Sequence, residues 1–199
     1  FSALRRTCAA AMLALPALAL AAYPEKPITI IVPFAAGGPT DVLTRVIAER
    51  MARELAQPMI VENTPGAGGT VGNARAARAK PDGYTVLAGN VGTLAASNSF
   101  YRKLPYDMHK DFVGIASIGD APQIVSARKD FPPTGLEALH DYVKPQESKV
   151  NFGAAGVGSG SYLGGVLLNN ALGLNVEAIN YRGAGQALTD VIAGHVDYM

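Results

Sequence analysis

Three glycine-rich turns are the segments of this sequence best suited to holding a ligand. They span residues 33–41 (PFAAGGPTD), 63–70 (NTPGAGGT) and 153–161 (GAAGVGSGS), and each stands between a predicted strand and a predicted helix. Glycine lets backbone N–H groups approach a bound molecule because it has no Cβ atom. A helix start adds unpaired N–H donors and a partial positive charge. A single such turn could simply make a tight corner, but three in one alternating sheet favour an anion site.

Polar side chains beside these turns could complete the site. Asp41 could cap the helix that begins near Thr40, or it could hold the first turn in shape for a ligand, and the sequence leaves both roles open. Asn90 and Thr93 follow a predicted strand, where they could donate hydrogen bonds to a carboxylate or form a polar loop. Arg182 ends another predicted strand and could bind an anion or lie in a solvated turn.

The nucleotide and catalytic motifs that often accompany glycine-rich turns are absent. No Gly-Lys pair occurs, which excludes a phosphate loop, and the dinucleotide pattern starting at Gly156 has Ser161 in place of its third glycine. No serine has the flanks of a G-x-S-x-G elbow. The histidines lie far apart, so their spacing indicates no metal site or catalytic pair: His109, His140 and His195. We therefore expect a binding protein without enzymatic activity, cofactor or metal.

The elements that must position these turns alternate between strand and helix patterns. Short β-branched runs at 29–32, 59–62 and 85–88 predict strands, and the segments 40–55 and 70–79 predict helices. This alternation is typical of an α/β fold with a largely parallel sheet. Apolar residues of the first helix recur at helical spacing, and we expect this stripe to be buried: Val42, Leu43, Val46, Ile47, Met51 and Leu55.

The alternation is looser between residues 105 and 130. Strand-like runs cover 112–118 and 123–127, and a short helical pattern covers 136–143. Strict alternation of strands and helices then returns: 150–153, 161–172, 178–181 and 186–193. The break predicts two lobes, the first over residues 23–105 and the second over residues 106–199.

Residues 1–22 have the pattern of a secretory signal peptide. Arg5 and Arg6 precede an apolar run that is too short to span a membrane, and we expect cleavage near Ala21 or Ala22. Removing this segment removes Cys8, the only cysteine, and changes the formal net charge from +1 to −1. A nearly neutral chain has no long-range field that attracts nucleic acid or anionic lipid, so we expect neither as a partner.

Several motifs occur in the order and spacing of one known family. They are YPEKPITIIVPFAAGGPTD at 23–41, VENTPGAGG at 61–69, PDGYT at 81–85, LPYD at 104–107 before DF at 111–112, YRG at 181–183, ALTD at 187–190 and GHVD at 194–197. Together they resemble the receptors of tripartite tricarboxylate transporters, also called the Bug family. One departure is Tyr162-Leu163, where family members often have His-Leu, and it leaves the choice of ligand open.

This resemblance implies a two-lobed periplasmic solute-binding protein with an α/β fold, type II-like, whose second lobe is incomplete here because family members continue beyond residue 199. The protein would be a monomer that closes on a small carboxylate, such as a di- or tricarboxylate, an acidic amino acid or an aromatic acid. It would then deliver this ligand to membrane transporter subunits. Two alternatives stay open, namely a ligand-sensing partner of a membrane signalling protein and an α/β enzyme.

The resemblance also assigns ligand-binding roles to residues of two turns. The first turn contributes Phe34, Ala35, Ala36, Gly37 and Gly38, and the opposing turn contributes Ala155, Gly156, Gly158 and Ser159. With the polar candidates Asp41, Asn90, Thr93 and Arg182, these residues form the predicted site.

Overall fold

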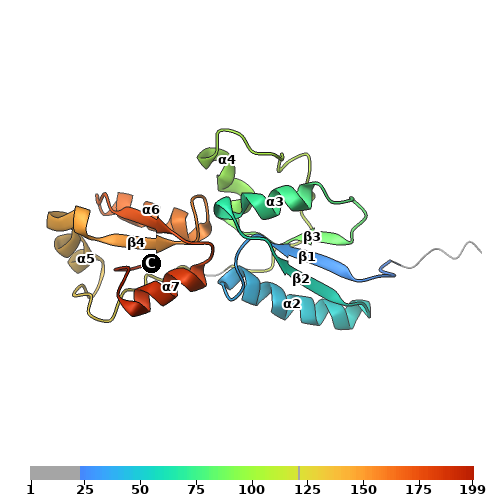
Figure 1. The fold of residues 1–199 in the computed structure, drawn as a ribbon, viewed down its shortest axis with the longest axis horizontal. Coiled ribbons are helices and arrows are strands. Elements are labelled where there is room, and N and C mark those ends of the chain that lie inside the picture. The colour runs from blue at the N-terminus through green and yellow to red at the C-terminus, as the bar shows by residue number, and fades with distance from the viewer. Residues whose placement is uncertain (1–22, 121) are drawn as a thin grey trace, which may run out of the picture.

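The structure, a computed structural model, describes residues 23–120 and 122–199, so the expected signal peptide lies outside the described residues. Two separate sheets flanked by helices form two lobes, which touch along one side (Figure 1). The first lobe runs from β1 (Ile28–Val32) to α4 (Ser97–Phe100), and the second runs from α5 (Leu136–Val143) to α7 (Ala184–Ala193).

The first lobe contains a parallel sheet with strand order β2-β1-β3. The central strand β1 is rich in β-branched residues and is buried at four of its five positions, as expected for a strand covered on both faces. It pairs with β2 (Met59–Asn63) on one side and with β3 (Thr85–Leu87) on the other. Helices α2 (Pro39–Leu55) and α3 (Thr70–Ala77) lie on opposite faces of the sheet (Figure 1).

Short helical turns complete the first lobe. Ala67–Gly69 forms a 3₁₀ turn directly before α3. Gly92–Ala96 forms a π-helical turn that continues into α4. Both turns follow strands of the sheet and stand on the side that faces the second lobe (Figure 1).

The second lobe is built on the parallel pair β4 (Asn151–Ala154) and β5 (Glu177–Asn180), covered by α5, α6 (Gly160–Ala171) and α7. A 3₁₀ segment, Lys144–Lys149, follows α5. Phe152 of β4 stacks on Tyr198, with ring centroids 6.0 Å apart. Together with neighbouring apolar side chains these rings form the core of the lobe: Phe131, Leu139, Val143, Val150, Phe152, Leu174 and Tyr198.

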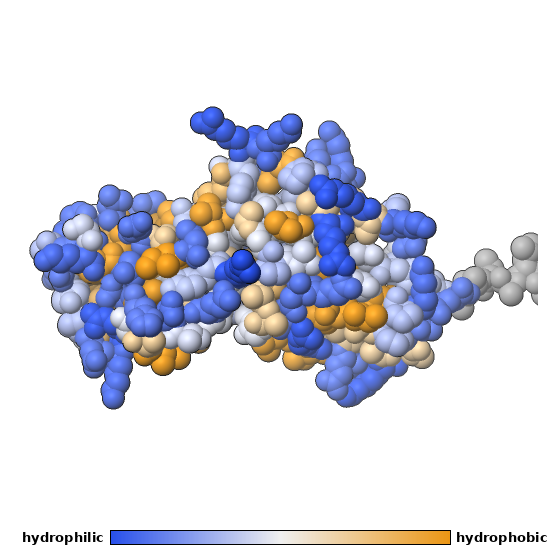
Figure 2. Space-filling view, viewed as in Figure 1, coloured by the Kyte–Doolittle hydropathy of each residue, from blue (hydrophilic) through white to orange (hydrophobic). Residues whose placement is uncertain are grey.

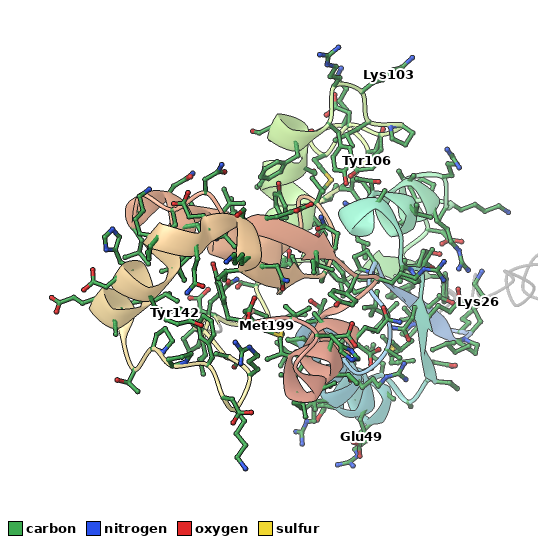
Figure 3. The ribbon with its side chains drawn as sticks, turned by 60° about the vertical axis from the view of Figure 1, so that its left-hand side comes forward. Lys26, Glu49, Lys103, Tyr106, Tyr142 and Met199 are labelled. Carbon is green, nitrogen blue, oxygen red and sulfur yellow. The ribbon has the colours of Figure 1, made fainter. Side chains whose placement is uncertain are left out.

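The expected buried stripe of α2 is wrong at Val42, Leu43 and Val46, which are exposed, whereas Ile47, Met51 and Leu55 are half-buried. The helix instead buries Asp41, Thr44 and Ala48, whereas Val42 is 52% exposed and Val46 is 62% exposed. In Figure 3 the side chain of Glu49, on the same helix, points away from the lobe. Figure 2 shows apolar side chains on the surface of this part of the molecule. The fully buried positions of the helix are therefore small or polar, and the carboxylate of Asp41 is bound inside the β1–α2 turn.

The strands expected over 112–118 and 123–127 are also wrong. Residues 112–118 pair with no strand among the described residues, and Val113 is 90% exposed. Only Ala127 pairs, through an isolated antiparallel bridge to Tyr198, which also bridges to Phe152 in parallel. A strand needs a neighbour for its backbone N–H and C=O groups, and the described residues supply one only at this bridge.

The α/β class is confirmed, and the boundary between residues 105 and 106 stays a prediction. No helix in the described ranges combines the length and the apolar character that crossing a membrane requires.

Candidate ligand-binding site between the lobes

A cavity of about 430 Å³ lies between the two lobes, where the carboxyl ends of the parallel strands face each other. The first lobe lines it with the end of β1, the turn after β2 and one residue after α4: Pro33, Phe34, Gly66, Ala67, Gly68, Gly69 and Tyr101. The second lobe contributes the ends of β4 and β5: Ala155, Gly156, Val157, Asn180, Tyr181 and Arg182. Both the volume and the position match the usual small-molecule site of such sheets.

The cavity lining favours an anion over a cation. Its lining includes no Asp or Glu, and Arg182 is the only charged residue in it. No carboxylate within the described ranges lies at salt-bridge distance from the Arg182 guanidinium. An incoming carboxylate could therefore pair with Arg182 without displacing an internal partner.

Four of the predicted site residues line the cavity, namely Phe34, Ala155, Gly156 and Arg182. Phe34 is 5% exposed and belongs to an apolar cluster that also contains Ala155 of the opposing lobe. The structure therefore brings the first and third glycine turns together through apolar contact at the cavity wall.

The rest of the first turn lies behind this wall. The Ala35 N–H donates to the backbone oxygen of Arg182 at 3.3 Å, a hydrogen bond between the lobes. Ala36 and Gly37 are exposed and Gly38 is buried, and none of the three lines the cavity. Gly37 has φ of +82°, in the left-handed region that favours glycine, so the turn depends on glycine at this position.

Asp41 holds the first turn in shape. Its carboxylate is buried and accepts hydrogen bonds from the Gly37 N–H at 2.9 Å, from Arg45 Nε at 3.0 Å and from Asn63 Nδ2 at 2.8 Å. Asn63 also donates to the backbone oxygen of Phe34 at 3.0 Å, which ties the cavity residue to the same network. Burial alone would raise the pKa of Asp41, but the hydrogen bonds from Arg45, Gly37 and Asn63 outweigh it and hold the pKa below its ordinary value.

We expect Asp41→Asn to lower the free energy of unfolding by about 1–3 kcal/mol at neutral pH, because it removes the charge that its donors need. A carboxylate with a lowered pKa contributes stability that is fully present above its ordinary value of 3.8 and is lost as the pH falls through the folded-state pKa. The difference between wild type and variant should therefore shrink at acid pH in urea titrations. A difference that stays constant on acidification would contradict this role. Glu49→Gln, on the exposed face of α2, is the control.

Asn90 and Thr93 bind each other rather than facing the cavity. The Asn90 N–H donates to Thr93 Oγ1 at 3.0 Å, and Asn90 Oδ1 accepts from the Gly92 N–H at 3.0 Å. Thr93 is 1% exposed and neither residue lines the cavity. Their side chains shape the turn after β3.

Gly158 and Ser159 form the start of α6. Gly158 lies beside Phe100 and Tyr101 of the first lobe. Ser159 is the N-cap, and its Oγ accepts a hydrogen bond from the Tyr162 N–H at 3.2 Å. The structure therefore gives Ser159 a role in the turn itself.

Replacing Ser159 with alanine should cost about 0.5–2 kcal/mol of unfolding free energy, because the cap bond is lost. Chemical denaturation measures this loss. The same change at the exposed Ser148 should have almost no effect. Equal losses at both positions would show that the cap is not the cause.

Sequence reasoning missed several lining residues. The second glycine turn was recognised as a possible anion site but was not included among the predicted site residues, although Gly66–Gly69 forms one wall. Tyr101 follows α4 in a segment without a motif, and only the folded chain places it beside Val157. No group of three or more His, Cys, Asp or Glu side chains in the described part of the chain could hold a metal ion.

Comparisons with known proteins agree with this architecture. A UPF0065 protein of Agrobacterium vitis is 42% identical over 175 residues, which are 88% of this chain and 50% of that protein. The solved structure of the periplasmic binding protein BugD has a TM-score of 0.79 at 39% identity, over 89% of this chain and 59% of that chain. MatC of Rhodopseudomonas palustris, solved with bound malate, has a TM-score of 0.85 at 41% identity, over 89% of this chain and 60% of that chain.

The chain thus spans only part of the length of these relatives. The model of the tripartite tricarboxylate transporter family receptors matches residues 43–199. That match covers most of the chain, including two of the three glycine turns, and it confirms the resemblance, while the likeness to the solved binding proteins confirms the fold class. The chain belongs to the tripartite tricarboxylate transporter receptor family.

Proposed function

We propose that the protein captures a small carboxylate in the cavity between its lobes and delivers it to a membrane transporter. One observation carries this proposal, namely that glycine turns from two different sheets converge on a cavity whose only charged lining residue is Arg182. Backbone N–H groups and one guanidinium can bind a carboxylate group whatever the shape of the rest of the ligand.

The nature of the lining supports a binding role rather than catalysis. The cavity contains no nucleophile paired with a base: its polar side chains are Tyr101, Asn180, Tyr181 and Arg182. Tyr181 donates to Asp190 Oδ2 at 2.6 Å, and burial, with this hydrogen bond, raises its pKa to about 12. Tyr181 therefore stays protonated at neutral pH and is a poor base.

The relatives support a carboxylate as the ligand. MatC, similar to this chain over both lobes, was solved with malate, a dicarboxylate. A cavity with one cationic side chain suits one carboxylate directly, and we expect backbone N–H groups of the glycine turns to bind a second one. We therefore place a dicarboxylate first among the candidates.

The family implies the partner and the place of action. Its members are described as receptors of a tripartite transporter, and BugD is described as a periplasmic binding protein. We infer the same location here, after cleavage near Ala21 or Ala22, and the same kind of membrane partner.

A thermal-melt panel tests the function. The full-length mature protein is heated with mono-, di- and tricarboxylates, aromatic acids and the corresponding neutral amides. A ligand at about 100 times its Kd adds about 2.7 kcal/mol to the stability of the folded form. We expect at least one acid to raise the Tm while its amide does not. A cooperatively folded protein whose Tm responds to no acid would contradict the proposal.

A further inference from the structure

Tyr101 connects the two lobes at the edge of the cavity. Its hydroxyl oxygen lies 2.8 Å from the backbone oxygen of Ala67 in the first lobe and 2.8 Å from that of Val157 in the second. A hydroxyl has a single hydrogen, so Tyr101 donates to one of these carbonyls at a time and stays within reach of both. The contact exists only while the two lobes are together.

Glycines allow the backbones to meet beside Tyr101. A Cβ atom placed on Gly68 would lie 1.8 Å from the Val157 oxygen, and one placed on Gly156 would lie 3.1 Å from the Gly68 Cα. Real Cβ atoms essentially never show the first of these distances, and the second is tighter than nine in ten real Cβ contacts. Any side chain at Gly68 would therefore separate the lobes.

Gly92 makes a second close approach, away from the cavity. A Cβ atom on Gly92 would lie 2.5 Å from the Gly158 oxygen and 2.6 Å from the Gly160 nitrogen, both at the start of α6. Gly92 does not line the cavity. It begins the helical turn Gly92–Ala96, where alanine is intrinsically more favourable than glycine. Replacing Gly92 with alanine should therefore not destabilise the first lobe by itself. It should disturb only the contact between the lobes.

We propose that Tyr101, Gly68 and Gly92 form an interlobe contact that sets the fraction of protein in the closed form, and that these positioning residues tune ligand affinity through it. The inference rests on the proposed function for its ligand, but the contact itself is independent of any ligand. Both walls of the cavity are in place only in the closed form. The apparent Kd is therefore inversely proportional to the fraction of protein in the closed form.

The test measures lobe separation and affinity in the same variants of the full-length protein. Spin labels on cysteines introduced at Arg50 and Asp141, 73% and 82% exposed on different lobes, report the distance between the lobes. We expect Gly92→Ala and Tyr101→Phe to shift the distance distribution of the unliganded protein to longer values. Both should weaken binding of the acid found in the melt panel by about tenfold or more.

A matched control separates backbone strain from lobe contact. Gly173 has φ of +64°, close to the +60° of Gly68, but nothing lies within 4 Å of an added Cβ. Gly68→Ala should open the lobes and weaken binding, whereas Gly173→Ala should change neither. Unchanged distances, together with affinities within about twofold of wild type in the Gly92 and Tyr101 variants, would overturn the inference. If wild type binds no acid, the proposed function fails, and the distance measurement still decides the role of the contact.

Discussion

Replacing Phe34 with alanine is expected to lower the free energy of unfolding by about 3–5 kcal/mol, the cost of removing a large buried ring. Phe34 is 5% exposed and packs in the core of the first lobe with Ile30, Val32 and Ala48. The same residue lines the cavity and belongs to an apolar cluster that includes Ala155 from the second lobe. Phe34→Ala should therefore reduce both stability and ligand affinity, measured by urea denaturation and calorimetric titration.

Two companion variants show whether burial is the cause of this loss. Phe34→Leu keeps most of the apolar volume and should lose clearly less stability than Phe34→Ala. Ile192→Ala removes an apolar side chain that is 76% exposed and should change stability by no more than about 0.5 kcal/mol. Similar losses in all three proteins would mean that Phe34 is not a core residue.

Arg182→Gln is expected to weaken binding of a carboxylate by about tenfold to hundredfold. A hydrogen bond to a charged group contributes about 1.5–3 kcal/mol, and every 1.4 kcal/mol changes the affinity tenfold. Arg182 is exposed and has no salt bridge within the described ranges, so its loss should leave the stability almost unchanged.

The control for Arg182 is Arg50→Gln. Arg50 carries the same charge but lies on the exposed side of α2, paired with Glu54. We expect wild-type affinity from this variant in calorimetric titration. A loss of affinity equal to that of Arg182→Gln would mean that net charge, rather than contact in the cavity, governs binding.

The strands and the glycine turns could be predicted because local signals determine them. Apolar β-branched runs gave β1 and β2, and the turn 153–161 was correctly placed between β4 and α6. The carboxyl ends of parallel strands share one edge of a sheet, so the convergence of turns within each sheet followed from the same pattern.

Other features depend on contacts that the local sequence does not contain. The apolar spacing of α2 predicted a buried Val42 and Val46, but both are exposed, and the helix instead buries Asp41, which accepts from the Gly37 N–H. Likewise, Tyr101 bonds to Ala67 and Val157, which are distant in sequence, so no local pattern marks it. The sequence left open whether the turn at Asn90 donates to a ligand or forms a polar loop, and in the structure Asn90 and Thr93 hydrogen-bond within the turn.

The most direct test of carboxylate capture is a calorimetric titration of the full-length mature protein with one acid and with its amide. The acid is the one that gives the largest Tm increase in the melt panel. We expect saturable binding of the acid, and binding of the amide weaker by about 100-fold or more, because the amide cannot form the charge-assisted hydrogen bonds to Arg182 and the turn N–H groups. Equal affinity for the acid and the amide, or no binding of either, would contradict carboxylate capture.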